Sequence, residues 1–490
     1  MRWHRVGLIA AVVALVAVAA VVLAGGDDAE RSEATTSTTT TSSTTTTTAP
    51  PVVGTPGEAG VGDPYYAGLG NGGYDVAHYD LAITWHPDDG TLDGVTTVEA
   101  MATQDLSRFN LDLAGLEVTA VTVDGAAAQY GHVDRELQIT PAVDIADGST
   151  FTTTVTYRGA PVPLQEGTDL FRVGWQTDGR EAFVASEPSG AATFFAVNDH
   201  PSDKATYRFQ ITAPGDQTVA ANGLLVGQEP VGDGTTRWTY ESDDLMASYL
   251  VQIAIGDYEL ADAGAIGAVK LRHAFHRAVA GSARAATART AEMIDLLDDV
   301  FGSYPFDAYG VVAVNERLGF ALETQGLTLI GSDIAEAGGG AEIILVHELA
   351  HQWVGNLVSP ATWKDIWLNE GFATYSEWLW TERRGGQSAA AQARELRNVG
   401  ADLSIPPGDP GAAELFDITV YWRGGMTLQA LREAVGDEAF FTILRRWIDE
   451  HQGGSASTPE FIALAETVSG QQLDDLFDRW LYQQGAPTFG

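Results

Sequence analysis

The sequence predicts a multidomain α+β protein, in which an N-terminal antiparallel β domain precedes a mainly helical domain with a small β-sheet. Residues 74 to about 258 run in short alternating segments rich in Val, Thr, Ile and aromatic residues, separated by Gly, Asp and Pro turns. Beyond Tyr258 the apolar residues recur at helical spacing. A chain of 490 residues also suits two or three domains of about 100 to 200 residues each.

Residues 1–26 are predicted to be a signal peptide or a signal anchor. Arg2 and Arg5 precede an apolar run from Val6 to Ala24, which is the order of an export signal. As a helix this run would span about 28 Å, close to the hydrocarbon thickness of a bilayer, so a cleavable signal and an uncleaved single-pass anchor both fit. We therefore expect an extracytoplasmic protein, secreted or anchored to the cell membrane by this segment.

Residues 27–63 are predicted to be a disordered Thr/Ser/Pro-rich linker. Every residue from Thr35 to Thr48 is Thr or Ser, and a stretch containing Gly and Pro continues to Asp63. Such a composition buries too little apolar area to fold by itself. The linker is glycosylated or bare, and the sequence favours neither.

The two folded domains are expected at residues 64–258 and 259–490. In the first, the clearest strand patterns cover residues 79–85, 95–101, 151–157 and 207–213. In the second, the helical patterns cover residues 282–301, 341–355, 366–384, 421–435 and 438–451. Residues 309–314 and 319–330 are β-like, which places a small sheet just before the helix of residues 341–355.

Composition excludes several classes of function. The formal charge of −39, from 66 acidic and 27 basic residues, would repel nucleic acid, so no nucleic-acid partner is expected. The chain has no cysteine, which rules out disulfides, thiolate metal sites and a cysteine nucleophile. A metal site must therefore use histidines and carboxylates.

The segment His347-Glu348-Leu349-Ala350-His351 lies in an apolar, proline-free stretch of helical length. Positions four apart share one helix face, so His347 and His351 can bind one ion, with Glu348 turned toward an adjacent ligand. Eighteen residues then separate His351 from Glu370, which lies in a second helical pattern. Two histidines and one glutamate leave a fourth position open for water, as in catalytic zinc sites, so we expect one Zn²⁺ per chain.

In this interpretation His347, His351 and Glu370 are the metal ligands. Zinc lowers the pKa of bound water toward about 7, and Glu348 can accept the proton as the water attacks a carbonyl. The alternative is a buried, neutral, hydrogen-bonded pair of histidines without metal.

These motifs, together with Trp353-Val354-Gly355-Asn356 and the segment from Trp367 to Ala373, resemble the gluzincin zinc aminopeptidases, the family of aminopeptidase N and leukotriene A4 hydrolase. The resemblance covers most of residues 74–490. It implies a β-saddle N-terminal domain and a thermolysin-like catalytic domain. It also implies a short form, because the chain ends about where longer members begin a further β domain and a large helical domain.

The resemblance also supplies candidate substrate-binding residues. The family carries a Gly-x-Met-Glu-Asn segment before the zinc helix, and here Gly319, Ala321 and Glu323 occupy that region, while Leu322 and Thr324 replace Met and Asn. Glu323, and Glu187 from the β domain, would hold the free α-ammonium of the substrate.

The family tyrosine that donates to the tetrahedral oxyanion corresponds to Tyr421. A phenol suits this role because it stays protonated at neutral pH.

The implied function is hydrolysis of N-terminal residues from peptides that have a free N-terminus. A zinc endopeptidase or an epoxide-opening hydrolase of the same fold is the alternative enzyme, and a non-catalytic scaffold is the alternative from another class. The sequence does not indicate the preferred N-terminal residue or the oligomeric state.

Overall fold

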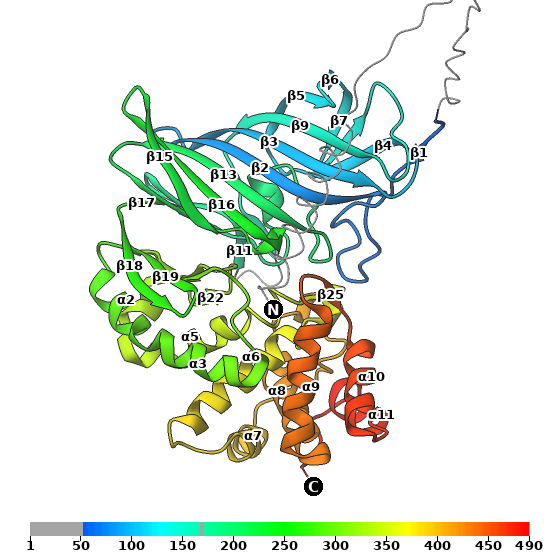
Figure 1. Ribbon diagram of the computed structural model, residues 1–490, viewed down its shortest axis with the longest axis vertical. Helices are drawn as coiled ribbons and strands as arrows, with labels where there is room; N and C mark the ends of the chain where they lie inside the picture. The colour runs from blue at the N-terminus through cyan, green and yellow to red at the C-terminus, as the bar shows by residue number, and fades with distance from the viewer. Residues whose placement is uncertain (1–51, 167–170, 490) are drawn as a thin grey trace, which may run out of the picture. The chain divides into compact units, whose positions relative to one another are not determined.

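The computed structural model describes residues 52–166 and 171–489, in which strands dominate the first half and helices the second (Figure 1). This confirms the predicted fold class of a β domain followed by a mainly helical domain with a small sheet. The expected signal segment and the linker up to residue 51 lie outside the described residues. Within the described ranges, none of the helices combines the length and hydropathy that crossing a membrane requires.

The largest sheet of the β domain has eight strands, which Figure 1 shows side by side. In β2 the residues Tyr79, Leu81, Ile83 and Trp85 alternate with more exposed ones and are all buried, which is the period-two pattern of a half-buried strand. In spatial order the strands are β15 (Leu224–Gly232), β16 (Thr235–Ala247), β13 (Lys204–Pro214), β2 (Tyr74–His86), β3 (Thr91–Ala102), β9 (Thr150–Gly159), β5 (Glu117–Val123) and β6 (Ala126–Ala127).

The sequence predicts a wholly antiparallel domain, and this is wrong for one pair of strands in this sheet. Strand β13 pairs with β2 in parallel, with Tyr207 opposite Tyr79. A short hairpin can join only antiparallel neighbours, whereas β2 and β13 are separated by the rest of the domain. Two further sheets complete the β domain. They are β1 (Thr55–Pro56), β4 (Leu106–Asp112), β8 (Glu136–Thr140) and β7 (Gln129–Val133), and then β10 (Leu164–Glu166), β11 (Phe171–Asp178), β12 (Glu181–Ala185), β17 (Ile253–Gly256) and β14 (Thr218–Ala221).

Residues 52–63 differ from the expected disordered linker. Strand β1 pairs with β4, and Asp63 is buried at 2% exposure. One Asp63 carboxylate oxygen accepts from the backbone N–H groups of Tyr65 and Tyr66, and the other accepts from Trp363 N–H at 2.8 Å. Composition missed this segment because its order comes from pairing with distant residues rather than from its own apolar side chains.

The helical domain opens with a six-stranded sheet, in which β22 is the edge strand beside β23. Its strands are β18 (Tyr258–Ile266), β19 (Val269–His276), β20 (Ala308–Tyr309), β21 (Val311–Ala313), β22 (Ala321–Leu322) and β23 (Thr328–Ile330). A two-stranded pair, β24 (Ser359–Pro360) and β25 (Ser455–Ala456), lies further along the chain.

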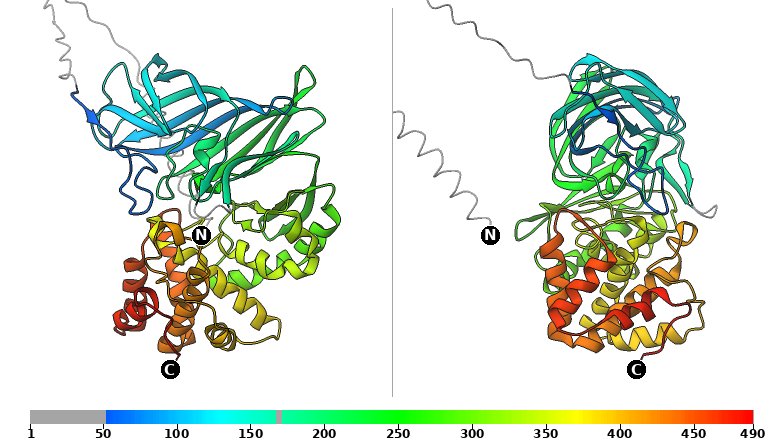
Figure 2. Two further views of the ribbon diagram at one scale, coloured as in Figure 1. Left: turned by 180° about the vertical axis from the view of Figure 1, so that it is seen from behind. Right: turned by 90° about the vertical axis from the view of Figure 1, so that its right-hand side faces the viewer.

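The helices follow this sheet, and those nearest the C-terminus lie together in both views of Figure 2. They are α2 (Ala280–Ala286), α3 (Thr290–Phe301), α4 (Ser332–Glu336), α5 (Glu342–Ala350), α6 (Trp367–Arg383), α7 (Ala389–Asn398), α8 (Ile418–Val435), α9 (Asp437–His451), α10 (Thr458–Ser469) and α11 (Asp474–Phe477). Short 3-10 turns are η1 (Ala191–Thr193), η2 (Ser248–Leu250), η3 (Thr287–Arg289), η4 (Gly338–Ala341), η5 (Trp363–Asp365) and η6 (Ala412–Glu414), and η7 (Asp478–Tyr482) is a π-helical turn.

Two predicted helices are shorter than expected. The helix predicted over residues 282–301 is interrupted by η3, where the hydroxyl of Thr287 donates to Ala283 O and that of Thr290 to Thr287 O. The helix predicted over residues 341–355 ends at Ala350, and Gly355 adopts a left-handed φ of +119°. Because α5 ends at Ala350, His351 caps the C-terminal end of this helix rather than lying inside it.

The β domain holds the turn that follows α5. The buried Lys204 ammonium at the start of β13 donates to Asn356 O at 2.7 Å and Leu357 O at 2.9 Å, and the Tyr249 hydroxyl donates to Gly355 O at 3.3 Å. The larger of two apolar core clusters among the described residues contains side chains from both domains. The two domains therefore meet at the chain segment that bears the predicted metal ligands.

Candidate metal centre

The structure brings His347, His351 and Glu370 together at the junction of α5 and α6. Oε2 of Glu370 lies 3.1 Å from Nε2 of His347 and 3.5 Å from Nε2 of His351. The three side chains are buried, and their donor atoms lie within 4.8 Å of one another. Two imidazole nitrogens from the C-terminal end of α5 and one carboxylate oxygen from α6 fit a zinc ion.

Outer partners orient both imidazoles. Nδ1 of His347 lies 2.6 Å from Oε1 of Glu377, and Nδ1 of His351 lies 3.0 Å from Val354 O. With Nδ1–H donating to these acceptors, each Nε2 is left to face a metal. Glu377 was not among the residues predicted from the sequence, although it lies seven residues after Glu370 and so on the same face of α6.

The electrostatics of the three ligands favour an anionic glutamate. Burial by itself would raise the pKa of Glu370, but the neighbouring histidines outweigh it and hold this pKa at about 2. Burial lowers the pKa of His351, yet Glu370 and Glu323 raise it to about 9. Glu370 therefore stays negatively charged at neutral pH beside the two histidine rings.

Glu348 lies one residue after His347 and is buried at 7% exposure. Burial raises its pKa to about 8, against the lowering effect of His347 and His351. A carboxylate whose pKa stands near neutrality is suited to accept and return a proton.

Close packing of α6 against α8 places Tyr421 beside His347. A Cβ atom on Gly371 would lie 2.8 Å from the backbone of Gly424, so only glycine lets the two helices approach this closely. Gly371 adjoins Glu370, and Gly424 lies one helical turn after Tyr421. The Tyr421 ring stacks on His347 with 5.9 Å between the ring centroids. Burial raises the pKa of Tyr421 well above its ordinary value, and Glu370 adds to the shift, so its hydroxyl keeps its proton.

Glu323 follows the edge strand β22. Its backbone oxygen accepts from the side-chain amides of Gln352, at 3.0 Å, and Asn356, at 2.7 Å, which ties it to the segment after α5. Upstream, Ala321 pairs with Ile330, and the exposed Gly319 donates its N–H to Asp333 at 3.1 Å with a φ of +75°. An edge strand leaves backbone groups free to pair with an extended peptide.

Glu187 reaches the same place from the β domain. Burial raises its pKa well above the ordinary value, and the charges of Glu323, Glu370 and Glu348 raise it further. Glu323 is buried at 2% exposure, and burial raises its pKa. Oε1 of each glutamate is buried and has no hydrogen-bond partner within the described part of the chain. Two unpaired buried acceptors are costly unless a donor such as an ammonium group occupies the space between them.

Comparison with known proteins agrees with this geometry. Residues 76–250 match the model of the peptidase M1 N-terminal domain, and residues 285–480 match that of the peptidase family M1 domain. Aminopeptidase M1 of Arabidopsis thaliana is 28% identical over 63% of this chain and 37% of its own length, and aminopeptidase 2 of Candida albicans is 23% identical over 84% and 47%. The chain thus spans half or less of these curated relatives.

The structural similarity extends over nearly all of a shorter protein. The crystal structure of an M1 zinc metallopeptidase from Deinococcus radiodurans has a TM-score of 0.82 and 33% identity, covering 88% of this chain and 98% of that one. A mutant of that enzyme bound to a Tyr-Ser-Ala substrate has a TM-score of 0.81 and 32% identity, covering 88% and 99%.

Proposed function

Because the chain belongs to peptidase family M1, we propose that it is a zinc aminopeptidase that removes N-terminal residues from peptides. The observation that carries the proposal is the pair of buried, unpaired carboxylate oxygens of Glu187 and Glu323, which lie beside the set His347, His351 and Glu370. An ammonium group bound between the two carboxylates would give both oxygens a hydrogen-bond donor.

In the proposed reaction, Glu187 and Glu323 bind the α-ammonium group of the first substrate residue. This anchor ends the site on one side, so the scissile bond is the one after the first residue. His347, His351 and Glu370 would hold one Zn²⁺, which when bound would supply a Lewis acid and would lower the pKa of a water molecule toward about 7. Glu348 accepts the proton from the attacking water and returns it to the leaving amine. The Tyr421 hydroxyl donates to the oxygen that becomes negative in the transition state.

The natural substrates that we propose are peptides with a free N-terminus. The Deinococcus relative with Tyr-Ser-Ala bound supports a peptide substrate. The relatives bound to L-tryptophan and to L-arginine support a site that accepts both an aromatic and a basic side chain. The alternatives are an endopeptidase, an epoxide-opening hydrolase and a scaffold.

The first experiment measures hydrolysis of aminoacyl-p-nitroanilides by the full-length chain, beside Nα-acetylated controls and a chelated sample. Release from free amines alone, abolished by the chelator and restored by zinc, is the expected result. Equal cleavage of acetylated substrates would indicate an endopeptidase. Bound zinc without any cleavage would indicate a scaffold or a substrate that is not a peptide.

We also propose that the protein acts outside the cytoplasm, secreted or held by its first 26 residues. The support is the order of basic and apolar residues, with Arg2 and Arg5 before the run from Val6 to Ala24. Cell fractionation with N-terminal sequencing of the recovered protein tests it. A mature protein that begins after this run is secreted, an intact N-terminus in the membrane fraction indicates an anchor, and a cytosolic protein contradicts the proposal.

A further inference from the structure

The turn that carries Glu187 is irregular backbone directly after β12. Gly190 N–H donates to Ser186 O at 2.6 Å and closes the turn around Glu187. Oε1 of Glu187 has no hydrogen-bond partner among the described residues. The position of this carboxylate oxygen therefore depends on how the turn itself is held.

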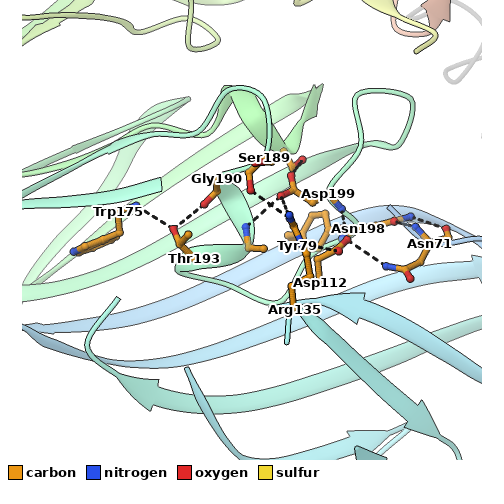
Figure 3. Close-up of polar contacts among 12 residues, drawn as sticks. Asn71, Tyr79, Asp112, Arg135, Trp175, Ser189, Gly190, Thr193, Asn198 and Asp199 are labelled. Atoms are coloured by element: carbon orange, nitrogen blue, oxygen red, sulfur yellow. Dashed lines mark hydrogen bonds and ion pairs between the residues drawn. The ribbon is translucent and has the colours of Figure 1, made fainter. Parts of the chain in front are cut away.

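Arg135, in the connection between β7 and β8, forms a hydrogen bond with this turn. Its Nη2 donates to Ser189 O, two residues after Glu187, and to Oδ2 of Asp199, at 3.3 Å in both cases (Figure 3). Its Nε lies 3.6 Å from Oδ1 of Asp112. Asp112 and Asp199 are buried at 0% and 1% exposure, so the guanidinium balances two buried carboxylates while it holds the Ser189 carbonyl.

Thr193 forms a second hydrogen bond with the same turn. Its hydroxyl donates to Gly190 O at 2.7 Å and accepts from Trp175 N–H at 3.0 Å, which links the turn to β11 (Figure 3). The chain is also fixed further on, where Asp112 and Val197 exchange backbone hydrogen bonds of 2.7 and 3.0 Å. Hydrogen bonds therefore fix the Glu187 turn at Ser189 and Gly190, and fix the following chain at Val197.

We propose that Arg135 and Thr193 are positioning residues for substrate binding, which act through Glu187 by fixing the turn from Ser186 to Gly190. The inference rests on the proposed function, in which Glu187 binds the substrate ammonium. Neither residue touches the reacting atoms. Each keeps the Glu187 carboxylate at the place where it can share the ammonium with Glu323, and a misplacement of about 1 Å from a distant change can cost on the order of 100-fold in rate.

A double-mutant cycle tests this with the full-length, zinc-loaded enzyme. Arg135→Lys keeps the charge that balances Asp112 and Asp199 but loses the forked donors. KM and kcat for a free-amine aminoacyl-p-nitroanilide are measured for the wild type, Arg135→Lys, Glu187→Gln and the double variant. Arg394→Lys is the matched control, because Arg394 of α7 makes a forked pair with Glu433 of α8 at 2.8 and 3.1 Å.

The expected result is a rise in KM of about tenfold for Arg135→Lys, with kcat and zinc content within about twofold of the wild type. In the Glu187→Gln background the same change should alter KM by less than about twofold, because contacts that act as one unit are not additive. Arg394→Lys should leave KM unchanged. Thr193→Val, which removes no charge, follows the same cycle and replaces Arg135→Lys if that variant does not fold.

The outcomes separate two failures. An unchanged KM for both positioning variants, or equal losses with and without the Glu187 carboxylate, would overturn the positioning role. If Glu187→Gln itself leaves KM unchanged, the proposed ammonium contact of Glu187 is wrong, and the inference falls with it.

Discussion

Removal of the Glu377 carboxylate should weaken zinc binding although Glu377 is not a ligand. Its Oε1 lies 2.6 Å from Nδ1 of His347, a short charge-assisted hydrogen bond that holds the ring with Nε2 toward Glu370. Loss of such an outer partner typically costs about 10 to 100-fold in metal affinity, or roughly 1.4 to 2.7 kcal/mol. The Glu377 side chain is 24% exposed, so we expect Glu377→Gln, which keeps an acceptor oxygen, near the lower figure and Glu377→Ala near the upper one.

The assay is competition for zinc between the protein and a chelator of known affinity, followed by kcat/KM at saturating zinc. Glu395→Gln on the exposed face of α7 is the matched control. Zinc affinities equal to the wild type in both Glu377 variants would refute the reasoning. A loss of folded protein, seen as a lower Tm in the control as well, would assign the effect to general stability instead.

Three further changes have defined outcomes. Glu348→Gln should lower kcat by about 10² to 10⁴-fold with zinc content unchanged, since proton transfer is lost while the ligands stay, and a kcat within tenfold of the wild type would exclude Glu348 as the base. Tyr421→Phe should lower kcat by about 10² to 10³-fold with little change in KM, and a change in KM alone would instead indicate a role in ground-state binding. Burial lowers the pKa of the Lys204 ammonium to about 7, below its ordinary value in the unfolded chain. Between about pH 7 and 10 the unfolded chain then binds the additional proton, so this residue makes the folded state more stable as pH rises. Lys204→Met should remove that contribution. In guanidinium titrations, the difference in unfolding free energy between the variant and the wild type should then change by up to about 1.4 kcal/mol per pH unit in this range. A difference that does not depend on pH would contradict this prediction.

Local sequence patterns were sufficient for the fold class and for much of the metal centre. The period-two pattern of β2 and the helical spacing of α5 and α6 depend on residues close in the chain, and both appear in the structure. His347 and His351 are four apart, so one helical turn brings them together. Glu370 was predicted from its place in a second helical pattern, eighteen residues after His351. The resemblance to a known family then supplied Tyr421, Glu323 and Glu187 as candidates, which spacing within one element could not.

Tertiary packing determined the contacts between segments that are far apart in the chain. The parallel pairing of β13 with β2, the order of residues 52–63 and the hold of Arg135 on the Glu187 turn join residues far apart in the chain. So does the close approach of Gly371 and Gly424, which sets Tyr421 beside His347. A local period records which face of an element is apolar, but the partner of that face depends on how all elements pack at once. For this reason the sequence indicates the metal ligands, while only the assembled fold shows what orients them.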